Sequence, residues 1–242
     1  MKKNHIRRNI VIAILCAAIT GTLFLSACGS DKENSGSSKN NKITSSSVSA
    51  ESEKAESTVS VEKEDTDSSY SDSDTTKITL NGDSVKIEGD GAQADGGKIT
   101  VSKAGSYFLS GKLNDGQVII NAGKDDTVKL ILNNAEITSS SSSAIYASKC
   151  GKTIIVLNEN TTNTISDTKT TSGDSQDDDS PNAAVYIQDD LTILGEGTLN
   201  VNGNAHNGIT TKDTLIITGG KILILYRNII LQIHMIIKKL QT

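Results

Sequence analysis

The chain has 242 residues and a formal net charge of −5 at pH 7, from 24 basic and 29 acidic side chains. Phosphate backbones repel an acidic protein, so this balance argues against nucleic acid as a partner. Three cysteines are too few for the disulfide framework of a small secreted scaffold. Glycine, asparagine, aspartate, threonine and serine separate short runs of isoleucine, valine and leucine, and there is no tryptophan. This composition favours a β-rich fold.

The N-terminus has the pattern of a bacterial lipoprotein signal. Four basic residues open the chain: Lys2, Lys3, Arg7 and Arg8. The mostly apolar run over residues 10–25 is short for a membrane span, which needs roughly 20 residues. It ends in Leu25-Ser26-Ala27-Cys28, where a small residue precedes cysteine as cleavage requires. We therefore expect a signal peptide at residues 1–27, lipid on Cys28, and a lipid-anchored protein on the extracellular face of the bacterial membrane. An uncleaved anchor helix is the alternative.

Residues 28–76 are rich in serine, glutamate, aspartate and lysine and contain few large apolar side chains. Such a segment buries too little apolar surface to offset its ordering entropy, so we predict a disordered linker. Removing the signal takes away four basic residues and no acidic ones. The remaining 20 basic and 29 acidic side chains give a net charge of −9, a sign that suits cation binding.

The folded part is predicted to begin at residue 77. Lys77-Ile78-Thr79-Leu80 and Ser84-Val85-Lys86-Ile87 alternate apolar and polar residues, as half-buried strands do. Turn signals follow at Asn81-Gly82 and Asp90-Gly91. Further short strands are expected at residues 98–101, 106–110 and 117–120. No segment has a sustained helical period.

A repeat of about 24 residues follows. One apolar ladder consists of Ile131, Ile155, Ile193 and Ile217, a second of Ile145, Val185 and Ile209, and a third of Ile137, Ile165, Leu199 and Ile222. An acidic insert at about residues 167–182 accounts for the longer spacing in the middle. Three short strands in each repeat are typical of one coil of a parallel β-helix, a solenoid whose inward side chains form a continuous apolar column. A β-sandwich is the alternative, but it does not predict a recurring three-strand unit.

Several phrases of the chain resemble one bacterial family. They are Leu113-Asn114-Asp115-Gly116-Gln117, Ala122-Gly123-Lys124-Asp125-Asp126-Thr127-Val128, Pro181-Asn182-Ala183-Ala184-Val185-Tyr186, Asp189-Asp190-Leu191-Thr192-Ile193, Gly197-Thr198-Leu199-Asn200-Val201-Asn202-Gly203-Asn204, Asn207-Gly208-Ile209, Lys212-Asp213 and Ile217-Thr218-Gly219-Gly220. The family that they resemble consists of calcium-binding surface proteins that bind carbohydrate. The resemblance implies a right-handed parallel β-helix over residues 77–222, with Ca²⁺ as cofactor and an acidic polysaccharide of the polygalacturonate type as ligand.

The chain departs from that family after Ile222. Residues 223–242 are rich in isoleucine, lysine and leucine, and they contain Arg227, the one arginine left after the signal is removed. A composition break inside a repeat indicates a truncated domain with an aberrant tail, as a frameshift would produce. A membrane-active tail is the alternative, but Lys238 and Lys239 interrupt any spanning run.

Candidate calcium ligands come from two places in the chain. Calcium prefers six to eight oxygen ligands from flexible carboxylates and carbonyls. The repeat and the insert supply the candidate side chains, which are Asp189, Asp190, Asp213, Asn207, Asp174, Asp177, Asp178 and Asp179. Because both protein and polyuronate are anionic, a divalent ion would bridge them. The alternative for Asp189 and Asp213 is turn chemistry, and for the insert it is a solvated loop.

The function predicted from the sequence is that of a non-catalytic, cell-surface carbohydrate-binding protein. The alternatives are a pectate lyase-like or polygalacturonase-like β-helix enzyme, or a structural adhesin-like surface protein. A lyase of that class needs a strong base, usually arginine, and Arg227 lies in the anomalous tail. The hydrolases need paired acids beside a basic anchor, which the residues around Asp189-Asp190 do not provide. The sequence therefore predicts no enzyme activity.

Overall fold

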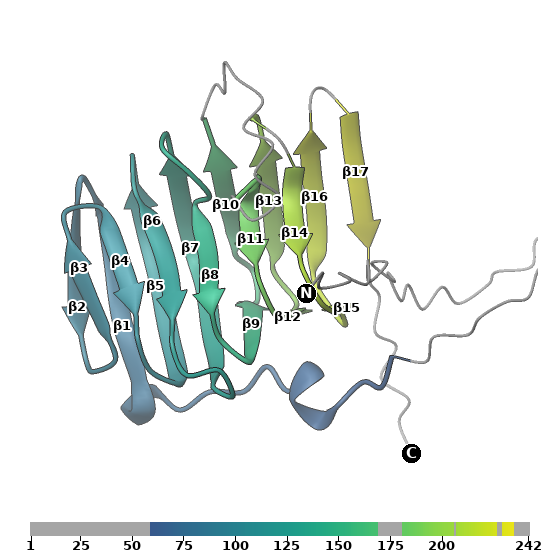
Figure 1. Ribbon diagram of the computed structural model, residues 1–242, viewed down its shortest axis with the longest axis horizontal. Helices are drawn as coiled ribbons and strands as arrows, with labels where there is room; N and C mark the ends of the chain where they lie inside the picture. The colour runs from purple at the N-terminus through teal and green to yellow at the C-terminus, as the bar shows by residue number, and fades with distance from the viewer. Residues whose placement is uncertain (1–58, 169–180, 206, 227–228, 235–242) are drawn as a thin grey trace, which may run out of the picture. The chain divides into compact units, whose positions relative to one another are not determined.

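The computed structural model describes residues 59–168, 181–205, 207–226 and 229–234, all of which belong to one compact unit (Figure 1). The described residues are almost entirely β-structure, which confirms the predicted all-β class. Two short 3₁₀ helices precede the strands: η1 Lys63–Asp65 and η2 Asp72–Asp74. The strands are β1 Thr75–Gly82, β2 Ser84–Glu88, β3 Ala92–Asp95, β4 Lys98–Val101, β5 Gly105–Leu113, β6 Gln117–Asn121, β7 Thr127–Ser139, β8 Ile145–Lys149, β9 Lys152–Leu157, β10 Thr162–Asp167, β11 Ala183–Ile187, β12 Asp190–Gly195, β13 Thr198–Gly203, β14 Asn207–Thr211, β15 Leu215–Ile217, β16 Lys221–Tyr226 and β17 Ile229–His234. No helix of the described residues is long and apolar enough to cross a membrane.

The strands form two sheets that face each other across the core (Figure 1). Sheet A has 11 strands and includes the path β15-β12-β9-β7-β10-β13-β16-β17, whereas sheet B has six strands in the order β14-β11-β8-β6-β4-β3. Most neighbouring strands are parallel. The antiparallel pairs are β1–β2, β3–β4 and β16–β17, and they lie at the two ends of the stack. Between these antiparallel pairs, the chain therefore returns repeatedly to both sheets in one direction.

The second predicted ladder is confirmed in sheet B. Val185 pairs with Ile145 on one side and with Ile209 on the other. These side chains contribute to one large buried cluster with the inward residues of sheet A. The 24 residues from Val185 to Ile209 therefore lead from one strand of sheet B to its parallel neighbour.

The first predicted ladder is wrong by one residue. Ile155 pairs with Leu130, not with Ile131, although it continues correctly to Ile193 and Ile217. In the third ladder Ile165 pairs with Ile137 as predicted, but its next partner is Val201 instead of Leu199. Ile131 pairs with Val156, and both are buried in a second, smaller cluster on the other face of sheet A. Both faces of these strands are buried, so their sequence shows no alternation that would reveal the register.

The prediction of a disordered linker over residues 28–76 is wrong for residues 59–76. Residues 59–74, here called the strap, run across the outer face of sheet A from β15 towards β1 (Figure 1). The ring of Tyr70 lies 6.0 Å from that of Phe108, and both rings pack on the smaller cluster. The members of that cluster are Ile131, Ile154, Val156 and Leu194, none of them more than 2% exposed. The strap is ordered because this outward apolar stripe needs a cover.

Buried ionic contacts fix the strap further. Asp65 is fully buried, and its carboxylate lies 3.0 Å from the amine of Lys152 and accepts a 2.6 Å hydrogen bond from the Thr192 hydroxyl. Its backbone carbonyl accepts a hydrogen bond from the Thr218 hydroxyl. The amine of Lys129 donates to the Asp67 carbonyl at 3.1 Å. One short segment therefore contacts Thr218, just after β15, and then β12, β9 and β7.

The predicted boundary between the domain and its tail lies inside a strand. Residue 222 is the second residue of β16, which pairs in parallel with β13 from Lys221 to Tyr226. β17 then pairs with β16 in the antiparallel direction. Regular pairing thus continues past the composition break, and the frameshift remains a prediction.

Candidate functional site

The predicted ligands Asp189 and Asp213 occupy equivalent places on neighbouring turns. Each lies two residues before a member of the register pair Leu191–Leu215. The Asp189 carboxylate accepts a hydrogen bond from the backbone N–H of Cys150 at 3.4 Å, and the Asp190 carboxylate accepts one from the N–H of Thr214 at 3.1 Å. These carboxylates therefore bond to backbone groups of adjacent turns.

The other predicted ligands do not complete a cluster with them. Asn207 begins β14 and pairs with Ala183, on the other sheet from β12. Asp174, Asp177, Asp178 and Asp179 lie outside the described residues. Within the described part of the chain, no group of three or more histidine, cysteine, aspartate or glutamate side chains could hold a metal ion. The described members of the predicted set thus do not form a metal cluster by themselves, and calcium binding at these residues stays a prediction.

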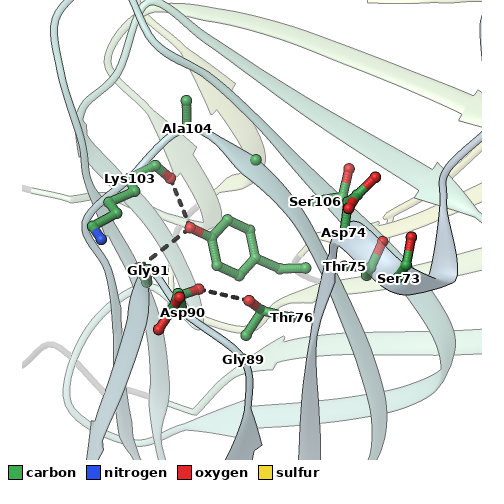
Figure 2. Close-up of a pocket in the computed structure, with 12 residues that line it drawn as sticks. Ser73, Asp74, Thr75, Thr76, Gly89, Asp90, Gly91, Lys103, Ala104 and Ser106 are labelled. Carbon is green, nitrogen blue, oxygen red and sulfur yellow. Dashed lines mark hydrogen bonds between the residues drawn. The ribbon is translucent and has the colours of Figure 1, made fainter.

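A hollow of about 290 Å³ lies where the strap meets the first hairpin (Figure 2). Most of its lining is polar or glycine: Ser73, Asp74, Thr75, Thr76, Gly89, Asp90, Gly91, Lys103, Ala104, Gly105, Ser106 and Tyr107. The Tyr107 hydroxyl donates to the Lys103 carbonyl at 2.7 Å, and the Thr76 hydroxyl donates to the Asp90 carbonyl at 2.6 Å. Burial, followed by the charge of Asp126, raises the pKa of Tyr107. The lining side chains thus largely bond to the wall of the hollow itself.

A tyrosine pair lies on the outer face of sheet B. Tyr146 and Tyr186 are register partners, with ring centroids 5.8 Å apart and an interplanar angle of 53°. The amine of Lys212 lies 5.8 Å from the centroid of the Tyr186 ring, and the Gln188 amide donates to the Tyr146 hydroxyl at 3.4 Å. Tyr186 is fully buried whereas Tyr146 is half-exposed. The buried Tyr186 ring therefore offers no face to a ligand, and Tyr146 alone of this pair is partly open, an arrangement that the sequence prediction missed.

Cys150 is a free and fully buried thiol. Its sulfur donates to the carbonyl oxygens of Asp126 and Lys152, each at 3.1 Å. Burial raises the pKa of the Cys150 thiol, and hydrogen bonding to Lys152 only partly opposes that effect. A protonated, enclosed thiol is unreactive, so Cys150 serves packing.

Comparison with known proteins assigns the family. A family model described as carbohydrate-binding domain-containing protein matches residues 95–228, more than half of the chain. The chain belongs to this family. The match contains the repeated parallel strands but begins after residues 73–91, which form one wall of the hollow. The repeated part of the sheets is therefore the part that the family shares.

Two relatives are similar to part of the chain. A carbohydrate-binding domain-containing protein of Acetivibrio thermocellus is 36% identical over 149 residues, which cover 61% of this chain and 52% of that protein. The chain thus spans about half the length of this relative. A solved structure, described as the polysaccharide lyase-like protein from C. thermocellum in a gadolinium derivative, is 36% identical with a TM-score of 0.58. That similarity covers 62% of this chain and 61% of that protein.

Proposed function

We propose that this protein is a non-catalytic, lipid-anchored receptor on the bacterial surface that binds acidic polysaccharide of the polygalacturonate type. The family match over residues 95–228 is the observation that carries the carbohydrate-binding part of the proposal. Surface anchoring rests on Leu25-Ser26-Ala27-Cys28, and the acidic ligand rests on the resemblance of the repeated phrases. A lyase-like enzyme is the second candidate, because the similar solved structure carries that description.

The same proposal includes the architecture. We infer that the repeated strands are coils of a right-handed parallel β-helix. The parallel pairs β6–β8, β8–β11 and β11–β14 in one sheet, and β7–β9, β9–β12 and β12–β15 in the other, support this inference. Successive coils of such a solenoid lie about 4.7–4.9 Å apart and form long, regular outer faces. A regular face suits a polymer with a repeating unit.

Binding without turnover is the first expected result. Polygalacturonate in a native gel should slow the migration of the full chain. Prolonged incubation of the chain with this polysaccharide should release neither unsaturated products nor new reducing ends. Mixing with chelator should weaken binding about tenfold if a divalent ion bridges the two anions. Asp189→Asn combined with Asp213→Asn should reduce the calcium effect, with Asp95→Asn as the exposed control on β3. Steady product formation would favour the lyase-like candidate, and binding that ignores the chelator would remove calcium from the proposal.

Membrane association is a separate expectation. Cys28→Ser should move the protein from the membrane fraction to the soluble fraction of cells, because the thiol is the proposed lipid attachment point. Cys150→Ser is the matched control, since this buried cysteine should leave the distribution unchanged. Mass spectrometry of the N-terminal peptide checks the modification itself. An intact signal with an unmodified Cys28 in the wild-type chain would refute the anchor.

A further inference from the structure

We propose that the outer face of strands β10, β13 and β16 is the surface on which the polysaccharide lies. This inference rests on the proposed function and names its binding face. The three strands are consecutive parallel neighbours in sheet A. Here the name polysaccharide face means the outward residues Thr162, Thr164, Thr198, Asn200 and Lys221.

Strand register lines these side chains up across the strands. Thr164 is directly opposite Asn200, and Thr162 is opposite Thr198, which is opposite Lys221 in turn. Adjacent rows are about 4.7–4.9 Å apart, the separation of hydrogen-bonded strands. A polysaccharide lying across β10 and β13 would meet polar groups at a constant interval. On β16 the row of Thr198 continues to Lys221, whereas the row of Asn200 continues to Leu223. The backbone ladders hold this interval without any ordering on binding, which lowers the entropic cost of association.

The side chains of the face are available for hydrogen bonds. Thr162 and Lys221 are exposed, and Thr164, Thr198 and Asn200 are half-exposed. Among the described residues, the Thr164 hydroxyl and the Asn200 amide have no side-chain partner. A hydroxyl and an amide can each donate and accept, as sugar hydroxyls do.

The charge of the face suits an acidic ligand. The outward residues described on these three strands include the Lys221 amine but no carboxylate, in a chain with 29 acidic residues. The bordering carboxylate, that of Glu136, is opposite Thr164 and forms a 2.6 Å ion pair with Lys112. A polyuronate therefore meets no outward carboxylate on these three strands, and Lys221 provides a favourable charge.

The stripe of sheet A beside this face is covered. The strap covers the outer face of β7, β9 and β12, where Ile154, Val156 and Leu194 are buried. On sheet B, Tyr186 is fully buried at the centre of the outer face. The face of β10, β13 and β16 is next to the strap-covered stripe, and its polar groups remain open.

Side-chain replacements test this surface directly. Thr164→Val combined with Asn200→Leu removes the hydrogen-bonding groups with little change in size. In the full chain we expect affinity for polygalacturonate to fall about tenfold or more, with an unchanged melting temperature. Lys221→Gln should weaken binding to polygalacturonate but not to a neutral glucan. The matched control is Thr210→Val, the same change at a half-exposed outward position of β14 in sheet B.

The outcomes separate this inference from the proposed function. Wild-type binding that the double variant retains, or loss of equal size in Thr210→Val, overturns the face while the carbohydrate-binding function stands. A wild-type chain that binds no polysaccharide overturns both. If the double variant does not fold, Asn200→Asp keeps the size of the side chain and adds a carboxylate. Binding of polygalacturonate to Asn200→Asp should then be weak at low salt and recover at high salt. An affinity of the wild-type chain that does not depend on salt would refute the face.

Discussion

Asp65→Asn is expected to lower the free energy of unfolding by about 2–4 kcal/mol, because it removes one partner from a buried ion pair. The Asp65 carboxylate accepts hydrogen bonds from the Thr192 hydroxyl at 2.6 Å and the Glu62 N–H at 2.8 Å, besides its contact with Lys152. An amide can replace one acceptor but cannot neutralise the Lys152 charge. Thermal and denaturant unfolding measure the change. Asp72→Asn, an exposed replacement in the same strap, is the control and should be nearly neutral.

The same carboxylate should give an acid-dependent loss of stability. Burial raises the pKa of Asp65, but the hydrogen bonds from Thr192, Glu62 and Lys152 outweigh it and hold the pKa below the ordinary value of 3.8. The stabilisation is therefore fully present above pH 3.8 and is lost as the pH falls through the lower, folded-state pKa. Burial lowers the pKa of Lys152, but Glu64 and Asp65 raise it above its ordinary value, so the lysine stays charged throughout. The difference in melting temperature between wild type and Asp65→Asn should narrow as the pH falls below 3.8. Parallel curves over the whole range would show that Asp65 contributes no ionic stabilisation.

Gly195→Ala is the second large expected effect. Gly195 ends β12 with φ +105°, a conformation that side chains rarely adopt, and a Cβ there would overlap the Leu157 carbonyl oxygen of the neighbouring strand. That oxygen accepts hydrogen bonds from the N–H groups of Glu196 at 3.0 Å and Gly197 at 3.2 Å. The clash therefore falls on a backbone contact between turns. We expect a loss of about 2–4 kcal/mol in the free energy of unfolding.

Gly96→Ala separates the two causes of that loss. Gly96 also has a positive φ, +57°, but a Cβ there would meet nothing within 4 Å. Its cost should be the conformational part alone, about 1–2 kcal/mol. Denaturant melts of both variants give the comparison. Equal losses would mean that the approach of β12 to β9 is not tight, and that the backbone conformation alone determines the requirement for glycine.

Regular spacing predicted one ladder of the fold correctly. In sheet B, the pairing of Val185 with Ile145 and Ile209 follows from the recurrence of the same phrase, although all of β11 is buried. In sheet A, Leu130-Ile131-Leu132 is buried on both faces, and the same reasoning placed the partner of Ile155 one residue too far along the chain. A run without alternation does not indicate which residue faces the core.

For the candidate site, too, the spacing in the sequence predicted one part and strand pairing determined the rest. Asp189 and Asp213 could be placed at equivalent turns from their spacing, but not their backbone hydrogen bonds, which depend on which turn lies next to them. Thr164 and Asn200 are 36 positions apart in sequence and carry no motif. Only the pairing of β10 with β13 brings them together on one face.

The sequence by itself determined the β-rich class, the repeated strands and membership of a carbohydrate-binding family, because periodicity and repeated phrases are local properties. It did not reveal the strap, whose composition is that of a disordered segment. Tertiary structure decided that the strap is ordered. Its few apolar and charged groups find their partners Phe108, Lys152 and Thr192 on three different strands of sheet A. It also decided which outer face is covered and which is open. Burial by a distant segment removes water from one stripe of the sheet and leaves the polar rows beside it hydrated, and no local pattern records that difference.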